Sequence, residues 1–486
     1  MVIVKRKVLL SVFALVLSVS EQAIAATTAQ EYELRYRDVY FHYYSRDYFT
    51  AITRGLAEQE MQRLATDKRD FDLLLGLLYS GYGLKNDAEA MLTQVTKSAK
   101  NRVRLNSARF YLARQYYEDG QAERALSLLS KTDGELPEFL VSQSLYLNFF
   151  LMAQLGRSTQ SEDALKKLKN YPYWYQYAAY NHGASLIKAG DLQHGISFLN
   201  EVGEDESKSL EMRALADKAN TALGFHFLKV NQPEQAVNYF QRVKLDGPYS
   251  HKAMLGLGWA YSQQKDYEHA LTPWLQLARG AVHETTVQEG VLASAFALQK
   301  IGAQQDALNN YENAIAIYQM LKDNIQITTH KIRNGEITSA LIQGEDFSDA
   351  AISDRLATVL KRDQGHLLGK LLQETHFQKA FRQYRDLRDL SVRLQNWKQQ
   401  VRPYVGLRNS RNQTAQSNGP AVNPDILWQR LEERGKRLES LLKDYELSIQ
   451  RLMVEALDKQ HLFVSNYLSQ ARYAVAQLLD EQVPRR

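Results

Sequence analysis

The chain has 486 residues, of which 44% are hydrophobic and 24% charged, and its formal net charge is +5. So weak a positive balance over this length excludes strong nucleic-acid character, and we expect no nucleic-acid partner. The absence of cysteine excludes disulfides and lipid attachment at a cysteine, and it argues against a structural zinc site.

Residues 1–25 predict a signal peptide. Residues 5–7 are basic, residues 8–19 are apolar but too few to cross a bilayer comfortably, and residues 23–25 read Ala-Ile-Ala, a small-x-small cleavage pattern. We expect cleavage after Ala25 and a periplasmic location, with the formal charge falling from +5 to about +3. An uncleaved N-terminal anchor is the alternative. No later segment is apolar for long enough to predict a membrane span.

Residues 26–54 predict an aromatic-rich N-terminal helical cap. Its tyrosines recur at spacings near four, at Tyr32, Tyr36, Tyr40, Tyr43 and Tyr44. Two interpretations are open. The rings pack on the first repeat, which we favour, or they form a cage for a ligand.

Residues 55–318 repeat a pattern with a period near 34. The residues Leu223, Gly224, Phe227, Ala236 and Phe240 recur 34 positions later as Leu257, Gly258, Tyr261, Ala270 and Trp274. Weaker copies place the small residue of the first helix at positions 76, 113, 183 and 295, and a degenerate copy spans 139–168. A period of this length is typical of stacked helical hairpins, which bury together an apolar face that none can bury alone. We expect an all-α solenoid of about seven hairpins.

These offsets resemble the tetratricopeptide repeat family, in which a Leu-Gly pair and an aromatic lie on the first helix of each unit. An alanine and a second aromatic follow on the second helix, as at Ala236 and Phe240 here. The resemblance implies a superhelix whose inner face is lined by the first helices and binds an extended segment of a protein partner.

The resemblance also implies which side chains line this groove. In the repeats above they are Lys218, Phe225, Lys229, Lys252, Trp259, Gln263, Phe296, Lys300, Arg114 and Tyr117. Interleaved basic and aromatic side chains suit a peptide that carries carboxylates. The alternative is that the aromatic rings only pack between hairpins and the lysines are ordinary surface residues.

Three segments follow the repeats. Residues 319–402 predict a C-terminal helical extension, with an apolar stripe from Phe377 to Trp397 at helical spacing. Residues 403–425 are rich in Pro, Gly, Asn and Ser and predict a flexible loop. Residues 426–486 predict a long last helix. The two long helices favour an antiparallel hairpin or a seam between two copies, although Arg434 and Ser448 interrupt any sustained coiled-coil heptad.

The segment 377–412 is strongly basic, with nine Lys or Arg against two Asp. We expect a basic contact surface at Arg382, Arg385 and Arg393, facing anionic lipid headgroups or an acidic protein. A solvated outer face, balanced by glutamates at 432, 433 and 439, is the alternative.

No residue pattern indicates catalysis, because the chain has neither a nucleophile turn, nor a phosphate loop, nor paired metal ligands. We therefore expect no enzyme activity, no cofactor and no metal. The leading hypothesis is a non-enzymatic periplasmic scaffold that binds an envelope protein or peptide segment. An alternative is an accessory subunit of an envelope machine for polysaccharide export, pilus assembly or proton-driven transport, by fold-level analogy. A cell-wall hydrolase is the third hypothesis.

Overall fold

The computed structural model describes residues 36–60, 71–132, 135–204, 209–341, 354–356, 358–360, 362–405 and 424–482. These residues form helices and turns with no β-strand, which confirms the all-α prediction. None of the described helices is long and apolar enough to span a membrane. The predicted signal peptide and most of the predicted loop at 403–425 lie outside the described residues. The chain divides into two compact units, Met1–Ala178 and Ala179–Arg486.

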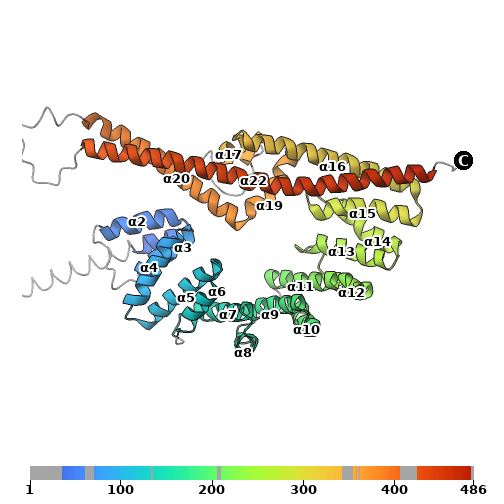
Figure 1. Ribbon diagram of the computed structural model, residues 1–486, viewed down its shortest axis with the longest axis horizontal. Coiled ribbons are helices and arrows are strands. Elements are labelled where there is room, and N and C mark those ends of the chain that lie inside the picture. Colours follow the sequence, from blue (N-terminus) through green and yellow to red (C-terminus); the bar gives the residue numbers. More distant parts are fainter. Residues whose placement is uncertain are drawn as a thin grey trace, which may run out of the picture. The chain divides into compact units, whose positions relative to one another are not determined.

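The first unit holds the earlier repeats (Figure 1). Its helices are α2 (Tyr48–Glu60), α3 (Phe71–Tyr82), α4 (Lys85–Ser98), α5 (Arg102–Glu118), α6 (Ala122–Leu129), α7 (Glu138–Gln154), α8 (Ser158–Leu168) and the start of α9 (Pro172–Ala189). Residues 36–44 are helical and precede α2. In this cap, Tyr36 and Val39 are buried against Phe71 and Leu74, whereas Tyr44 is 76% exposed. The cap therefore packs on the first repeat, as the favoured interpretation expects.

The second unit holds the later repeats and the C-terminal helices. Its repeat helices are the rest of α9, α10 (Leu192–Gly203), α11 (Leu210–Lys229), α12 (Pro233–Arg242), α13 (Ser250–Gln263), α14 (Tyr267–Ala278), α15 (Thr285–Ile301) and α16 (Gln304–Arg333). From α3 to α16 the described helices form seven consecutive pairs, which confirms the predicted number of hairpins.

Each of these hairpins turns by the same backbone device. The turn residue has a positive φ, and the N–H of the residue after it donates to a carbonyl five positions earlier in the first helix. In one turn Lys265 has φ 63°, and the N–H of Asp266 donates to the oxygen of Tyr261 at 3.0 Å. This arrangement satisfies helix-end carbonyls that would otherwise lack a partner. The positive φ recurs at Gly83, Gly120, Gly156, Gly190, Asn231 and Gly302.

The repeated glycine marks the closest approach within a hairpin. A Cβ added at Gly224 would lie 2.5 Å from Cε1 of Phe240, and one added at Gly258 would lie 2.2 Å from Nε1 of Trp274. Ala236 and Ala270 on the second helices are completely buried. The small residues are therefore required because an aromatic ring of the second helix already fills the space beside the first helix.

The C-terminal part continues from the last repeat without an interruption at residue 318. Helix α16 runs through that predicted boundary to Arg333. After it come α17 (Glu336–Leu341), α19 (Arg362–Gln373), α20 (Thr375–Val401), the short 3-10 helix η1 (Arg402–Tyr404) and α22 (Pro424–Gln482). Helix α22 has 59 residues. Trp397, predicted to lie on the apolar stripe of α20, is 51% exposed.

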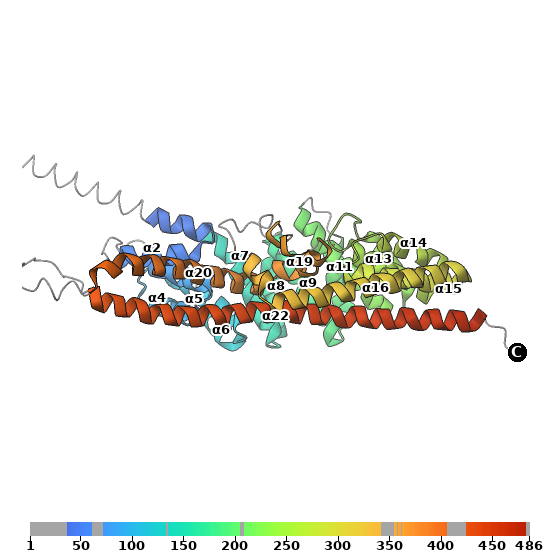
Figure 2. The same cartoon turned by 90° about the horizontal axis from the view of Figure 1, so that it is seen from above.

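Helix α22 has two successive neighbours along its length (Figures 1 and 2). Its first half lies antiparallel to α20, with the Tyr445 hydroxyl 3.3 Å from Oε1 of Gln383. Its second half lies antiparallel to α16, with the rings of Tyr318 and Tyr467 5.9 Å apart. Helix α22 also contacts α15, just as α15 contacts both α14 and α13. The second half of α22 therefore occupies the place that the first helix of a further repeat would take.

Candidate binding surface

Three of the predicted groove residues form an aromatic row on successive first helices of the second unit. Phe225 lies on α11, Trp259 on α13 and Phe296 on α15. Phe225 is 38% exposed while its ring contacts Phe240 edge-on, with centroids 5.1 Å apart. Trp259 is half-buried and contacts both Trp274, at 4.9 Å, and Phe296, at 6.5 Å. These rings pack between helices, and each of the three side chains also remains partly exposed.

The predicted lysines lie beside aromatic rings. The Lys218 ammonium is 4.4 Å from the centroid of Tyr180 and the Lys252 ammonium 5.9 Å from that of Tyr249, distances at which a cation is attracted to the ring face. Lys300 stands 5.4 Å from the ring of Phe296 in the same way. Burial raises the pKa of both tyrosines, so each remains a neutral hydrogen-bond donor. In these contacts the ammonium groups therefore lie against aromatic rings.

Two further groove residues lie at the end of their first helices. Lys229 and Gln263 are both exposed. The Gln263 amide donates to the backbone oxygen of Leu228 at 3.3 Å and so joins α13 to α11. The structure thus brings the carboxyl ends of these two helices together, with Lys229 next to the contact.

Glu289 is a residue of this surface that the sequence reasoning missed. Its carboxylate accepts a hydrogen bond from the indole nitrogen of Trp259 at 2.9 Å. It accepts a second from the hydroxyl of Tyr467 on α22 at 3.2 Å. Glu289 follows Lys252 by 37 positions, the same step that leads from Gly258 to the small residue Ala295. Continuing from Lys218 and Lys252 by that step leads to Glu289, where the charge at this repeat position changes from positive to negative.

Arg114 and Tyr117 belong to the first unit, on α5. The Arg114 guanidinium lies 5.3 Å from the centroid of Tyr111 and its Nε 3.7 Å from a carboxylate oxygen of Glu118. Tyr117 contacts Phe150 edge-on at 5.3 Å. These two residues therefore have their own neighbours within the first unit.

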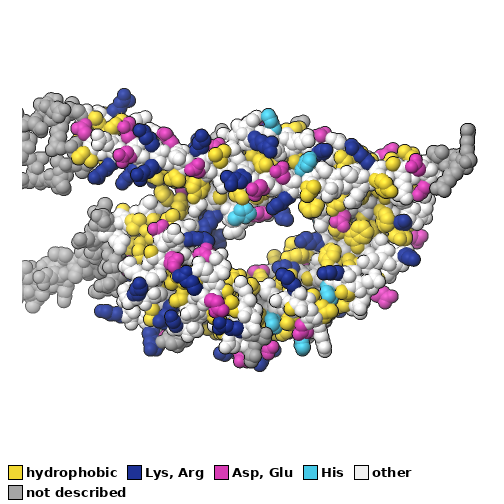
Figure 3. Space-filling model, in the orientation of Figure 1, with side chains coloured by type: hydrophobic (Ala, Val, Ile, Leu, Met, Phe, Trp, Pro, Cys, Tyr) yellow, Lys and Arg dark blue, Asp and Glu magenta, His cyan; other side chains and the backbone are white. Residues whose placement is uncertain are grey.

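The predicted basic contact surface lies on α20. Arg382 and Arg385 are half-buried, and Arg393 is exposed. The Arg385 guanidinium is 3.3 Å from the Asp386 carboxylate, which is itself nearly buried. Figure 3 shows basic and acidic side chains interspersed over the paired parts of α20 and α22. Acidic side chains thus accompany the basic ones along this pair of helices.

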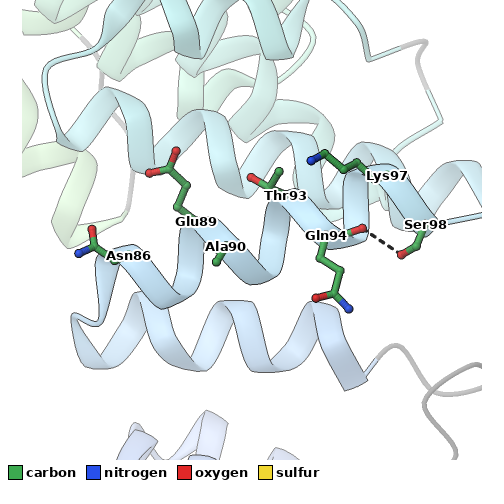
Figure 4. A pocket seen from close by; sticks show the side chains of 7 residues that line it. All are labelled: Asn86, Glu89, Ala90, Thr93, Gln94, Lys97 and Ser98. Atoms are coloured by element: carbon green, nitrogen blue, oxygen red, sulfur yellow. Dashed lines mark hydrogen bonds between the residues drawn. The ribbon is translucent and has the colours of Figure 1, made fainter.

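Two shallow cavities occur among the described residues. One, of about 690 Å³, is lined on α4 by Asn86, Glu89, Ala90, Thr93, Gln94, Lys97 and Ser98 (Figure 4). The other, of about 450 Å³, lies between α20 and α22 and includes Tyr384, Arg388 and Glu446. In the described part of the chain, no group of His, Asp and Glu is arranged to hold a metal ion. In the first cavity the Ser98 hydroxyl donates to the backbone oxygen of Gln94 at 2.9 Å (Figure 4).

The repeats of the second unit are similar to those of a known family. Residues 221–282 match the tetratricopeptide repeat family, and no curated protein matches the chain. A tetratricopeptide repeat protein from Parabacteroides merdae is 16% identical, with 51% of this chain and 92% of that one covered and a TM-score of 0.36. The C-terminal part of a repeat protein from Cytophaga hutchinsonii is 15% identical, with 53% and 99% covered and a TM-score of 0.32. The apo form of RapI is 12% identical, with 68% and 99% covered and a TM-score of 0.43.

The fold and repeats define an α-helical repeat protein of the kind that serves as a protein-interaction scaffold. Within it, residues 221–282, the stretch that carries the two best-matched copies, are tetratricopeptide repeats.

Proposed function

We propose that the protein is a periplasmic scaffold that holds an extended, carboxylate-bearing segment of an envelope protein against α11, α13 and α15. The observation that carries the proposal is a repeated pair of side chains. Each of these helices has one aromatic residue and at least one lysine at groove positions, as in Phe225 with Lys229 and Trp259 with Lys252. Such a surface offers apolar contact to peptide side chains and charge to carboxylates.

Glu289 gives the proposed groove a direction. The corresponding position carries a lysine on α11 and on α13, Lys218 and Lys252, but a glutamate on α15. The Glu289 carboxylate accepts hydrogen bonds from Trp259 and Tyr467. A carboxylate of the partner is attracted by the two lysines and repelled by Glu289. The acidic part of the partner should therefore lie across α11 and α13, with a neutral or basic part next to α15.

The envelope setting is supported by the N-terminal sequence alone. A basic start, a short apolar stretch and Ala-Ile-Ala at 23–25 suit export followed by cleavage. A scaffold of this kind needs no cofactor, and we propose no enzyme activity for it.

Capture of partners from a periplasmic extract tests the proposal. The immobilised chain is compared with Lys218→Glu/Lys229→Glu/Lys252→Glu and with a control of equal charge change, Arg382→Glu/Arg385→Glu/Arg393→Glu. We expect the groove variant to lose the captured protein while melting close to the parent, and we expect the control to retain the captured protein. If the groove variant captures normally and the α20 variant does not, the proposed groove is wrong and the partner binds the C-terminal hairpin.

A further inference from the structure

The end of the α20/α22 hairpin gathers residues that are distant in sequence. Leu394 on α20 packs at Gly435 on α22, where an added Cβ would lie 3.2 Å from Cδ2 of Leu394. Together with the contact between Tyr445 and Gln383, this fixes an antiparallel register. The last turns of α20, the helix η1 and the first turns of α22 therefore lie at one end of the hairpin (Figures 1 and 2). We call residues 393–405 and 424–430 the hairpin tip.

The hairpin tip exposes several large apolar side chains. Trp397 is 51% exposed, Tyr404 62%, Val405 36% and Ile426 48%. The hairpin core, by contrast, is closed further along by buried leucines at 394, 431 and 438. Single exposed apolar residues are ordinary, but four within one short end of a hairpin indicate a contact surface.

The hairpin tip carries an excess of positive charge. Its basic residues are Arg393, Lys398, Arg402 and Arg430, and its one acidic residue is Asp425, which gives a net charge of +3. The chain has no acidic residue between Asp389 and Asp425. The Lys398 ammonium lies 5.3 Å from the ring centroid of Trp428, so cation and aromatic are combined in the same place.

We infer that the hairpin tip docks on a membrane surface that contains anionic lipid headgroups. Tryptophan and tyrosine favour the boundary between hydrocarbon and water because one part of the ring system is apolar and the other forms hydrogen bonds. Lysine and arginine next to them are attracted to anionic headgroups, at roughly 1 kcal/mol each. A protein surface of mixed charge would give no reason for the positive excess at the tip, whereas an anionic lipid surface gives one.

This docking is independent of the proposed groove, because the hairpin tip and the row from Phe225 to Phe296 share no residue. The docking contact is peripheral. The apolar side chains reach the headgroup region while α20 and α22 stay outside the bilayer. The tip would thereby hold the solenoid of the second unit close to a membrane.

Vesicle sedimentation of the full chain tests the inference. The parent chain is mixed with vesicles of phosphatidylcholine alone and with vesicles that also contain phosphatidylglycerol. We expect binding to the anionic vesicles only, and we expect added salt to weaken it. Lys398→Glu/Arg402→Glu should bind at least about thirty-fold more weakly, because two attractions of about 1 kcal/mol each are lost and two repulsive charges are added. The matched control, Lys166→Glu/Lys167→Glu, reverses two exposed lysines of α8 and should bind like the parent. The parent and both variants are prepared in the same way and share the same N-terminus, so any affinity of the N-terminal segment for lipid cancels.

A second measurement places the contact. Brominated lipids quench tryptophan that enters the headgroup region, and Trp397→Phe should remove part of that quenching without weakening the binding more than a few-fold. Three results would overturn the inference. They are equal binding to both vesicle types, equal loss in the tip and control variants, and a tip variant that changes self-association of the chain but not its lipid binding.

Discussion

Tyr467 donates a hydrogen bond to Glu289 across 178 positions of sequence, with 3.2 Å between the hydroxyl and Oε2. Burial and the Glu289 carboxylate raise the pKa of Tyr467, so the phenol stays protonated and able to donate. The same carboxylate holds the indole of Trp259. One acidic side chain thus connects the C-terminal helix α22 to two first helices of the solenoid.

Removing the Tyr467 hydroxyl should lower the stability of the protein. We expect Tyr467→Phe to lower the free energy of unfolding by about 1 kcal/mol, the usual net contribution of one hydrogen bond. Urea denaturation followed by circular dichroism measures it. Tyr473→Phe on the same helix is the control, since Tyr473 is 73% exposed, and it should not differ from the parent. Equal stability of Tyr467→Phe and the parent would mean that the bond contributes nothing.

The glycine at the tightest helix contact should not tolerate even one methyl group. Because a Cβ at Gly258 would lie 2.2 Å from Nε1 of Trp274, we expect Gly258→Ala to destabilise the protein by about 1–3 kcal/mol. Gly365→Ala is the matched control, because no atom lies within 4 Å of the added Cβ there. That control should be neutral or stabilise helix α19 by up to about 1 kcal/mol. Similar melting temperatures for the two variants would contradict the packing described for the repeats.

Replacing a lysine that has a left-handed backbone conformation by glycine should stabilise the protein. Lys265 has φ 63°, a conformation that costs most side chains roughly 1–2 kcal/mol but costs glycine little. After the greater chain entropy of glycine is subtracted, we expect Lys265→Gly to stabilise the protein by about 0.5–1 kcal/mol. Asn231→Gly should gain less, because asparagine tolerates φ 59° better than lysine does. Thermal melts of both variants decide this, and a loss of stability in Lys265→Gly would refute the expectation.

The N-terminus of the protein purified from cells should begin at Ala26. The expectation follows from the basic start and the Ala-Ile-Ala pattern that ends at Ala25. N-terminal sequencing and intact mass measure it directly. Recovery of Met1 on membrane-bound protein would instead favour an uncleaved anchor.

The repeated part of the fold could be predicted from the sequence because its determinants are local. Gly258 must lie against Trp274 sixteen positions later, and the turn between them is set by the residues at 261–266. A hairpin of this kind brings its matched residues together whatever the rest of the chain does. The period and the number of hairpins can consequently both be read from the spacing.

The candidate surface could be predicted only in part from the sequence. The spacing predicted which first-helix positions carry Phe225, Trp259 and the lysines, but not that the rings would be half-buried or that Glu289 would hold the indole. Exposure depends on the neighbouring hairpin and on α22, and both lie outside any one repeat.

The sequence by itself determined the all-α class and the number of about seven hairpins, because both depend on contacts within about 34 residues. Only the tertiary structure decided where the 59-residue helix α22 lies, along α20 for its first half and along α16 for its second. An apolar stripe shows that a helix needs a partner but does not specify which one, since any complementary apolar surface can bury it. The choice was made by contacts such as Tyr467 with Glu289, whose two members the sequence alone gives no reason to pair.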